Sequence, residues 1–222
     1  MGDRESAQET YRAVSPLMTL YAVIVGLALT EGLTHFLQLG TPNWPHSALP
    51  SILRSLPLFL VFVSTLARFF HGALLHVEQC YRPGAGYLKY RGGSALLDFL
   101  GFAVEGALFF VMSVLLHRPR GFLVSYTFVA GIDVIWALLS ESVMQLRESP
   151  GRPHAKTWWR LNLTLSFFLF ALFWADRLLR APQWVLSWTV LLAVGVVTYL
   201  DYKTLWNFYF GLEEADSEVP KT

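Results

Sequence analysis

The chain has 222 residues, of which 54% are hydrophobic and only 15% are charged, whereas a soluble domain carries roughly 25% charged residues. This composition, together with 17 Phe, 9 Tyr and 8 Trp, is typical of a protein embedded in a lipid bilayer. The formal net charge of +1 and the lack of a basic tract argue against a nucleic-acid partner. The single cysteine, Cys80, excludes an intrachain disulfide and a cysteine cluster for a metal within one chain.

Six apolar runs are long enough to cross the hydrocarbon core of a membrane, which takes about 20 helical residues. In chain order they are Val14–Leu39, Leu56–Val77, Ser94–Leu116, Gly121–Leu146, Trp158–Leu179 and Trp184–Phe210. Charged residues, prolines and glycines separate these runs and end each helix. The sequence therefore predicts an all-α polytopic membrane protein, in which one six-helix domain (14–210) lies between a short N-terminal segment (1–13) and an acidic tail (211–222).

The first run is too long for the apolar core of a removable signal peptide, so we expect it to be a true span. Six spans put both termini on one side of the membrane, and the Lys and Arg residues other than Arg68 and Lys203, which lie inside spans, then fall into two sets. The terminal side holds Arg4, Arg12, Arg82, Lys89, Arg91, Arg147, Arg152, Lys156, Arg160 and Lys221, and the opposite side holds Arg54, Arg118, Arg120, Arg177 and Arg180. By the positive-inside rule, this excess predicts cytoplasmic termini in a multi-pass protein of the cell inner membrane.

Carboxylates inside the predicted spans are the main functional signal of the sequence. They are Glu31, Asp98, Glu105, Asp133, Glu141, Asp176 and Asp201. An ionised side chain at the bilayer centre costs between about 2.5 and 17 kcal/mol, so such residues usually face the bundle interior, pair with one another, or line a wet path. At about 1.5 Å of rise per residue, the polar positions crowd the cytoplasmic half of the spans and become sparse toward the outside.

This distribution predicts a channel or transporter that moves protons or a small cation through a carboxylate-lined path, in a homo-oligomer. Glu105 and Asp133 form the predicted central site, because they lie near mid-membrane without an obvious cationic neighbour. The other predicted parts of the path are a cytoplasmic vestibule (Asp98, Glu141 and Asp201), a gate or charge-balancing pair (Arg68 and His71) and an outer exit (Glu31 and His35).

Simple ion pairing is the alternative reading of the same residues. Arg68 would pair with Asp98 or Glu141 and so lock helices together, since an unpaired guanidinium at this depth is costly. Lys203 would pair in the same way with Asp201. Asp176 would meet water or one of two nearby arginines, Arg177 and Arg180, at the outer surface.

No cofactor and no metal site are predicted. His71 and His76 are five residues apart, which puts them about 140° apart around a helix, so they do not form a same-face metal pair. A haem would need facing histidines at one depth on two helices, and His35, the remaining histidine within a span, is predicted in the opposite half.

Two other functions remain open from the sequence. A membrane enzyme could bind the headgroup of a lipid or polyprenyl substrate at the cytoplasmic interface, with Arg68, His71, Asp98 and Glu141 as its site residues. A non-catalytic assembly or effector subunit would use the same charges only to hold its helices together.

Overall fold

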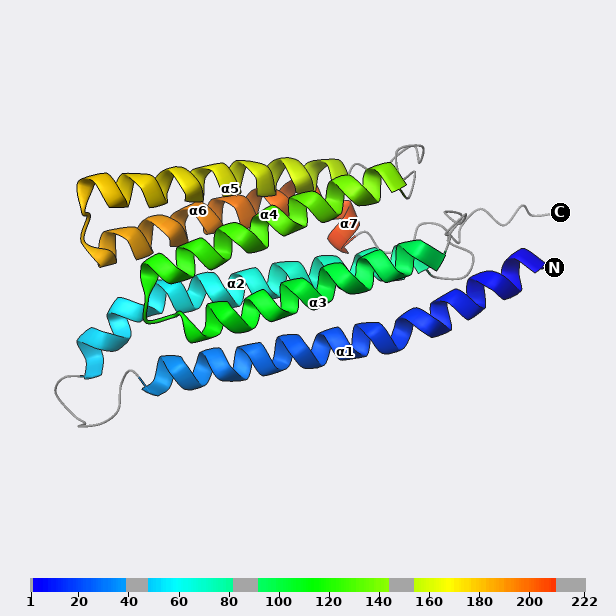
Figure 1. The fold of residues 1–222 in the computed structure, drawn as a ribbon, viewed down its shortest axis with the longest axis horizontal. Helices are drawn as coiled ribbons and strands as arrows, with labels where there is room; N and C mark the ends of the chain where they lie inside the picture. The colour runs from blue at the N-terminus through cyan, green and yellow to red at the C-terminus, as the bar shows by residue number, and fades with distance from the viewer. Residues whose placement is uncertain (1, 39–47, 82–91, 144–153, 211–222) are drawn as a thin grey trace.

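The computed structural model describes residues 2–38, 48–81, 92–143 and 154–210 (Figure 1). The helices in this part of the chain are α1 (Gly2–Gln38), α2 (Ala48–Tyr81), α3 (Gly92–Val114), α4 (Pro119–Val143), α5 (His154–Leu179), α6 (Gln183–Thr204) and α7 (Trp206–Phe210). Six of these helices are long and apolar enough to cross a membrane. The prediction of an all-helical, multi-pass membrane protein is thereby confirmed.

The helix boundaries differ from the predicted spans in two places. Helix α1 begins at Gly2, so most of the predicted N-terminal segment continues the first span as helix. The last span was predicted to run unbroken to Phe210, which is wrong, because the helix ends at Thr204 and α7 begins at Trp206. Leu205 between them has φ −109° and ψ 27°. The tail (211–222) and the predicted span ends at 39 and 144–146 lie outside the described residues.

The six long helices close into a ring (Figure 1). Helices that follow one another in the chain run in opposite directions. Helix α1 packs on α2 and α3, α3 packs on α4, α4 on α5, α5 on α6, and α6 returns to α2. In Figure 1, α1, α2 and α3 lie in the lower part of the bundle and α4, α5 and α6 in the upper part. Helices α2 and α4 are the most buried of the six, so polar residues on their inner faces are removed from lipid.

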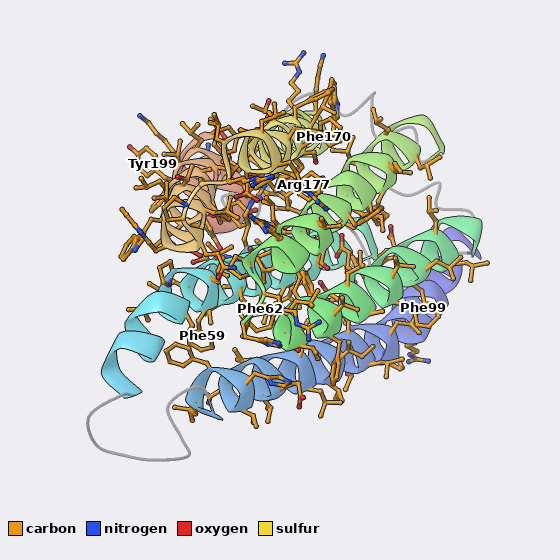
Figure 2. The ribbon with its side chains drawn as sticks, turned by 60° about the vertical axis from the view of Figure 1, so that its left-hand side comes forward. Phe59, Phe62, Phe99, Phe170, Arg177 and Tyr199 are labelled. Atoms are coloured by element: carbon orange, nitrogen blue, oxygen red, sulfur yellow. The ribbon has the colours of Figure 1, made fainter. Side chains whose placement is uncertain are left out.

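Aromatic side chains divide clearly between the interior and the outer surface of this ring (Figure 2). Phe62 is fully buried and lies where a side chain on Gly32 of α1 would be. Phe170 and Tyr199 project from the bundle, with 55% and 62% of their surface exposed. An outer face made of such apolar side chains suits contact with lipid.

Two glycines admit the indole rings of tryptophans from neighbouring helices. A Cβ on Gly101 of α3 would lie 2.8 Å from Cδ1 of Trp136 on α4. A Cβ on Gly72 of α2 would fall on the ring of Trp158 on α5. Small residues commonly allow close helix approach in membranes, and here they set the positions of two buried tryptophans.

We expect Gly72→Ala to displace the Trp158 indole and to destabilise the fold by about 1–3 kcal/mol, as overpacking of a well-packed interior does. Thermal unfolding in detergent, followed by tryptophan fluorescence, measures both effects. Gly195→Ala is the matched control, because a Cβ at this exposed helical glycine meets no atom within 4 Å. Equal midpoints for the two variants would contradict the assignment.

Candidate functional site

A small cavity lies inside the ring, between helices α2, α3, α4 and α5. Its lining residues are Arg68, Phe69, Ala73, Phe102, Glu105, Asp133, Trp136, Trp158 and Asn162. The water-accessible volume of the cavity is about 20 Å³, which is room for one or two water molecules. Four aromatic rings form much of the wall, and the polar side chains between them are the candidate functional groups.

Glu105 and Asp133, the predicted central pair, line this one cavity from two different helices. Each side chain is buried, with 4% and 5% of the residue surface exposed. Tyr21 of α1 donates a hydrogen bond to Glu105, with 3.4 Å between Oη and Oε2. Asn162 of α5 donates a short hydrogen bond from Nδ2 to Oδ2 of Asp133. Four helices therefore converge on the two carboxyl groups.

Arg68 also lines the cavity, but its ion pair is with Asp201 of α6. Nε of Arg68 lies 2.7 Å from Oδ2 of Asp201, and both side chains are almost fully buried. The predicted pairing of Arg68 with Asp98 was therefore wrong, and the alternative pairing with Glu141 involves a side chain outside the described residues. The cause is the ring closure of α2 on α6, which brings together two residues 133 positions apart in the chain.

Helix α7 adds a second layer to this ion pair. Tyr209 donates a hydrogen bond from Oη to Oδ2 of Asp201 at 2.9 Å, and Trp158 donates from Nε1 to the same hydroxyl at 3.1 Å. Burial, and then the neighbouring carboxylate, raise the pKa of Tyr209 above its ordinary range. Tyr209 therefore stays protonated across physiological pH, and its donor remains in place.

Two polar atoms of the cavity residues have no hydrogen-bond partner among the described residues. They are the donor Nη1 of Arg68 and the acceptor Oδ1 of Asn162. A buried polar group without a partner costs about 1–3 kcal/mol. Water has the hydrogen-bonding chemistry that each atom needs, because it accepts from a guanidinium and donates to an amide oxygen.

Asp98 stands in a separate buried cluster nearer the Gly92 end of α3. Its Oδ2 accepts a hydrogen bond from Tyr81 at 2.7 Å, and its Oδ1 accepts one from Nε1 of Trp136 at 3.0 Å. Nε2 of His76 lies 3.4 Å from Oδ2 of Asp98. Asp98 is thus not part of the cavity wall, and Trp136 is the residue common to the cavity and this cluster.

The predicted outer exit residues, and His71 of the predicted gate, lie away from the cavity wall, whereas Arg68 lines it. Glu31 and His35 pair with each other at 3.0 Å and are partly exposed. His71 is half-buried, and its Nδ1 lies 3.2 Å from the hydroxyl of Tyr202. Glu141 is on α4, but its side chain lies outside the described part of the structure.

Two predicted pairings have different partners in the structure. Asp176 is buried and accepts a hydrogen bond from Nε of Arg120 at 2.6 Å, instead of meeting Arg177, Arg180 or water. Lys203 is exposed and lies over the Tyr199 ring, so it is not the partner of Asp201. No group of three or more metal-ligating side chains occurs within residues 2–38, 48–81, 92–143 and 154–210.

Sequence reasoning missed the neutral residues of the site. In the sequence, these residues resemble ordinary span or interface residues. They are Tyr21, Asn162, Trp136, Trp158 and Tyr209. Asn162 carries the clearest overlooked signal, because an amide in the middle of an apolar run needs a polar partner inside a membrane. That partner is Asp133.

The fold and its buried charged cavity define the protein as an integral, multi-pass membrane protein with a polar site in its interior. Comparison of the chain with protein-family models, with curated proteins and with solved structures found no match. The function is therefore argued from the geometry of the site.

We expect Asp201→Asn to lower the free energy of unfolding by about 3–5 kcal/mol, because it leaves the Arg68 charge buried without its counter-ion. Asp176→Asn is the matched control. Its partner Arg120 is exposed, so water can solvate the remaining charge, and the loss should be much smaller. Chemical or thermal unfolding in detergent compares the two, and equal losses would contradict the central role of the Arg68–Asp201 pair.

Proposed function

We propose that the protein carries protons across the membrane, with Glu105 and Asp133 as the exchanging groups at the centre of the path. The observation that supports this proposal is the position of the two carboxyl groups. They come from different helices, are removed from lipid, and line one cavity that has room for water. Buried ionisable residues of this kind are the usual components of proton relays in membranes.

Hydrogen-bonding groups beside the two carboxyls support a relay. The Tyr21 hydroxyl contacts Glu105, and the Asn162 amide contacts Asp133. A proton leaves one carboxylic acid for a water molecule in the cavity, and that water gives a proton to the other carboxylate. Arg68 Nη1 and Asn162 Oδ1, which have no hydrogen-bond partner among the described residues, offer such a water a donor and an acceptor.

A proton fits this site better than a metal cation does. Arg68 contributes a permanent positive charge to the same wall, and that charge repels a cation in the cavity. A hard cation also needs about six oxygen ligands, whereas the cavity is walled largely by aromatic rings. A proton needs only a chain of hydrogen bonds, and it moves in steps through a space this small.

The remaining predicted residues extend the path in both directions. Asp98, Glu141 and Asp201 belong to the end of the bundle where α3 begins and where α4 and α6 end, and they form the proposed cytoplasmic vestibule. Arg68 balances the charge of Asp201. His71, one helical turn after Arg68 on α2, is the second residue of the proposed gate. Glu31 is ten residues beyond Tyr21 on α1, about 15 Å further along the helix, and forms the outer exit with His35.

The two rival functions make different demands on the same residues. A lipid-headgroup enzyme would need Arg68, His71 and Asp98 to face one substrate, but these side chains engage Asp201, Tyr202 and Tyr81 instead. An assembly subunit would need only the stabilising pairs. That role would leave Glu105 and Asp133 without a reason to be in the interior, where burying a carboxyl group is costly.

We expect Glu105→Gln and Asp133→Asn each to lower proton flux by about tenfold or more, because each removes a proton-exchanging group. The assay uses proteoliposomes with an internal pH dye and a potassium diffusion potential. Glu78→Gln is the control, since Glu78 is an exposed carboxylate at the end of α2. Wild-type flux of protons and of small cations in both variants would contradict the proposal, and a loss of stability alone would favour an assembly role.

We also propose that both termini are cytoplasmic, in a homo-oligomer of the cell inner membrane. The excess of Lys and Arg at that end of the bundle supports this orientation. In a Cys80→Ser background, Pro182→Cys should react with a membrane-impermeant maleimide in intact cells. Asn207→Cys should react only after permeabilisation. Both positions are exposed, and the reverse pattern would contradict the orientation.

A further inference from the structure

A second buried cluster of titratable groups lies beside the cavity and is not used by the central carboxyl pair. It consists of Asp98 from α3, His76 and Tyr81 from α2, and Trp136 from α4. Exposed surface amounts to 1% for His76, 2% for Asp98 and 1% for Tyr81. A buried histidine beside a buried carboxylate needs an explanation, because both groups lose hydration that ordinary apolar side chains would not require.

The cluster lies nearer to the proposed cytoplasmic end of the bundle than the cavity does. Asp98 precedes Glu105 by seven residues on α3, about 10 Å along the helix, and His76 follows Arg68 by eight on α2, about 12 Å. Because α2 and α3 run in opposite directions, both displacements are toward the same end of the bundle. A group that exchanges protons here would therefore lie between the cavity and that end.

Trp136 contacts both the cavity and the His76–Asp98 cluster but cannot transfer a proton between them. Its ring lines the cavity, its Nε1 donates to Asp98 at 3.0 Å, and its centroid is 4.8 Å from the His76 ring. An indole has one donor and no acceptor, so it cannot pass a proton from one side to the other. While this ring stays in place, the cluster and the cavity are two separate proton sites.

Within the cluster, His76 is the group suited to bind and release a proton near neutral pH. Tyr81 and Trp136 are fixed donors to Asp98, since neither loses its proton in this range. Histidine is the side chain whose ordinary titration falls between pH 5 and 8. The imidazolium that forms when His76 takes up a proton lies against the Asp98 carboxylate, 3.4 Å away.

Titratable residues of the other helices that pack on α2 are committed elsewhere. Tyr21 of α1 bonds Glu105, Asp201 of α6 pairs with Arg68, and Tyr209 of α7 bonds Asp201. Tyr202 of α6 contacts His71. Asp98 of α3 is a charged group that lies against His76, with 3.4 Å between Oδ2 and Nε2.

We propose that His76 and Asp98 form a second proton-binding site, which the Trp136 indole separates from the Glu105–Asp133 cavity. This proposal rests on the proposed proton function and adds a second proton-binding site to the proton path. One proton binds the neutral imidazole from the cytoplasmic side, gives an imidazolium paired with the carboxylate, and leaves to water when the indole moves. In the first transfer an O–H bond of the cytoplasmic-side hydronium breaks as the N–H bond forms, and in the second the N–H bond breaks as a new O–H bond forms on the accepting water.

The test measures the protonation of His76 directly in the full-length chain reconstituted in lipid. Ring ¹⁵N chemical shifts distinguish neutral imidazole from imidazolium, and His76→Gln assigns the resonance among the six histidines. We expect His76 to change from the neutral to the doubly protonated form between about pH 8 and pH 5. We expect Asp98→Asn to move the midpoint of that change. A His76 that keeps one protonation state over this range overturns the proposal.

Proton flux provides the second readout. His76→Gln should lower the flux by about tenfold and remove its pH dependence between about pH 5 and 8. Glu78→Gln, at an exposed position on α2 two residues from His76, should do neither. If His76→Gln fails to fold, Asp98→Asn supplies the same comparison with a side chain of equal size. Wild-type flux and an unchanged pH profile in the folded variant overturn the second site.

These outcomes separate the two proposals. Full flux in Glu105→Gln and Asp133→Asn would refute proton transport through the cavity, while the ¹⁵N titration would still decide whether His76 and Asp98 bind a proton. Loss of flux in those two variants, with no change in the protonation state of His76, would support the transport function and refute the second proton-binding site.

Discussion

The ion pair between Arg68 and Asp201 is the constraint on which the rest of the interior depends. A guanidinium keeps its charge at any physiological pH, so a bundle that encloses one must supply a counter-ion and exclude lipid from both. Here the counter-ion comes from α6, and the pair joins α2 to the helix that completes the ring. The Tyr209 hydroxyl and the Trp158 indole then continue the hydrogen-bonded chain outward from Asp201.

The same pair shapes the chemistry of the neighbouring cavity. Arg68 uses Nε for Asp201, while its Nη1 stays free of described partners, so one guanidinium both stabilises the bundle and offers a donor to the interior. Glu105 and Asp133 have neutral hydrogen-bond partners, Tyr21 and Asn162, in place of cations. A carboxyl group with a neutral partner can gain or lose its proton without breaking a salt bridge. Arg68 thus supports the helices, and the two carboxyls remain available for exchange.

Hydropathy alone predicted the fold class and the six spans, because the length of an apolar run is a local property of the chain. It missed the break at Leu205, since apolar residues continue on both sides of the turn. The meeting of Glu105 and Asp133 was predicted from their depth. The partner of Arg68 was not, because the contact between α2 and α6 depends on how the ring closes. Asn162 and the aromatic wall were missed for a related reason, since in a membrane the same residue types also face lipid or the interface.

The fit between glycine and tryptophan in the cavity wall carries an evolutionary consequence. Gly101 of α3 accepts Trp136 from α4, the adjacent helix of the ring, and Gly72 of α2 accepts Trp158 from α5 across the interior. We therefore expect the two positions of each pair to change together, because a methyl group on the glycine would meet the opposite ring unless that ring became smaller. Divergent homologues that lose one of these tryptophans are free to lose its glycine as well, and the shape of the cavity then drifts while the charged residues around it stay the same.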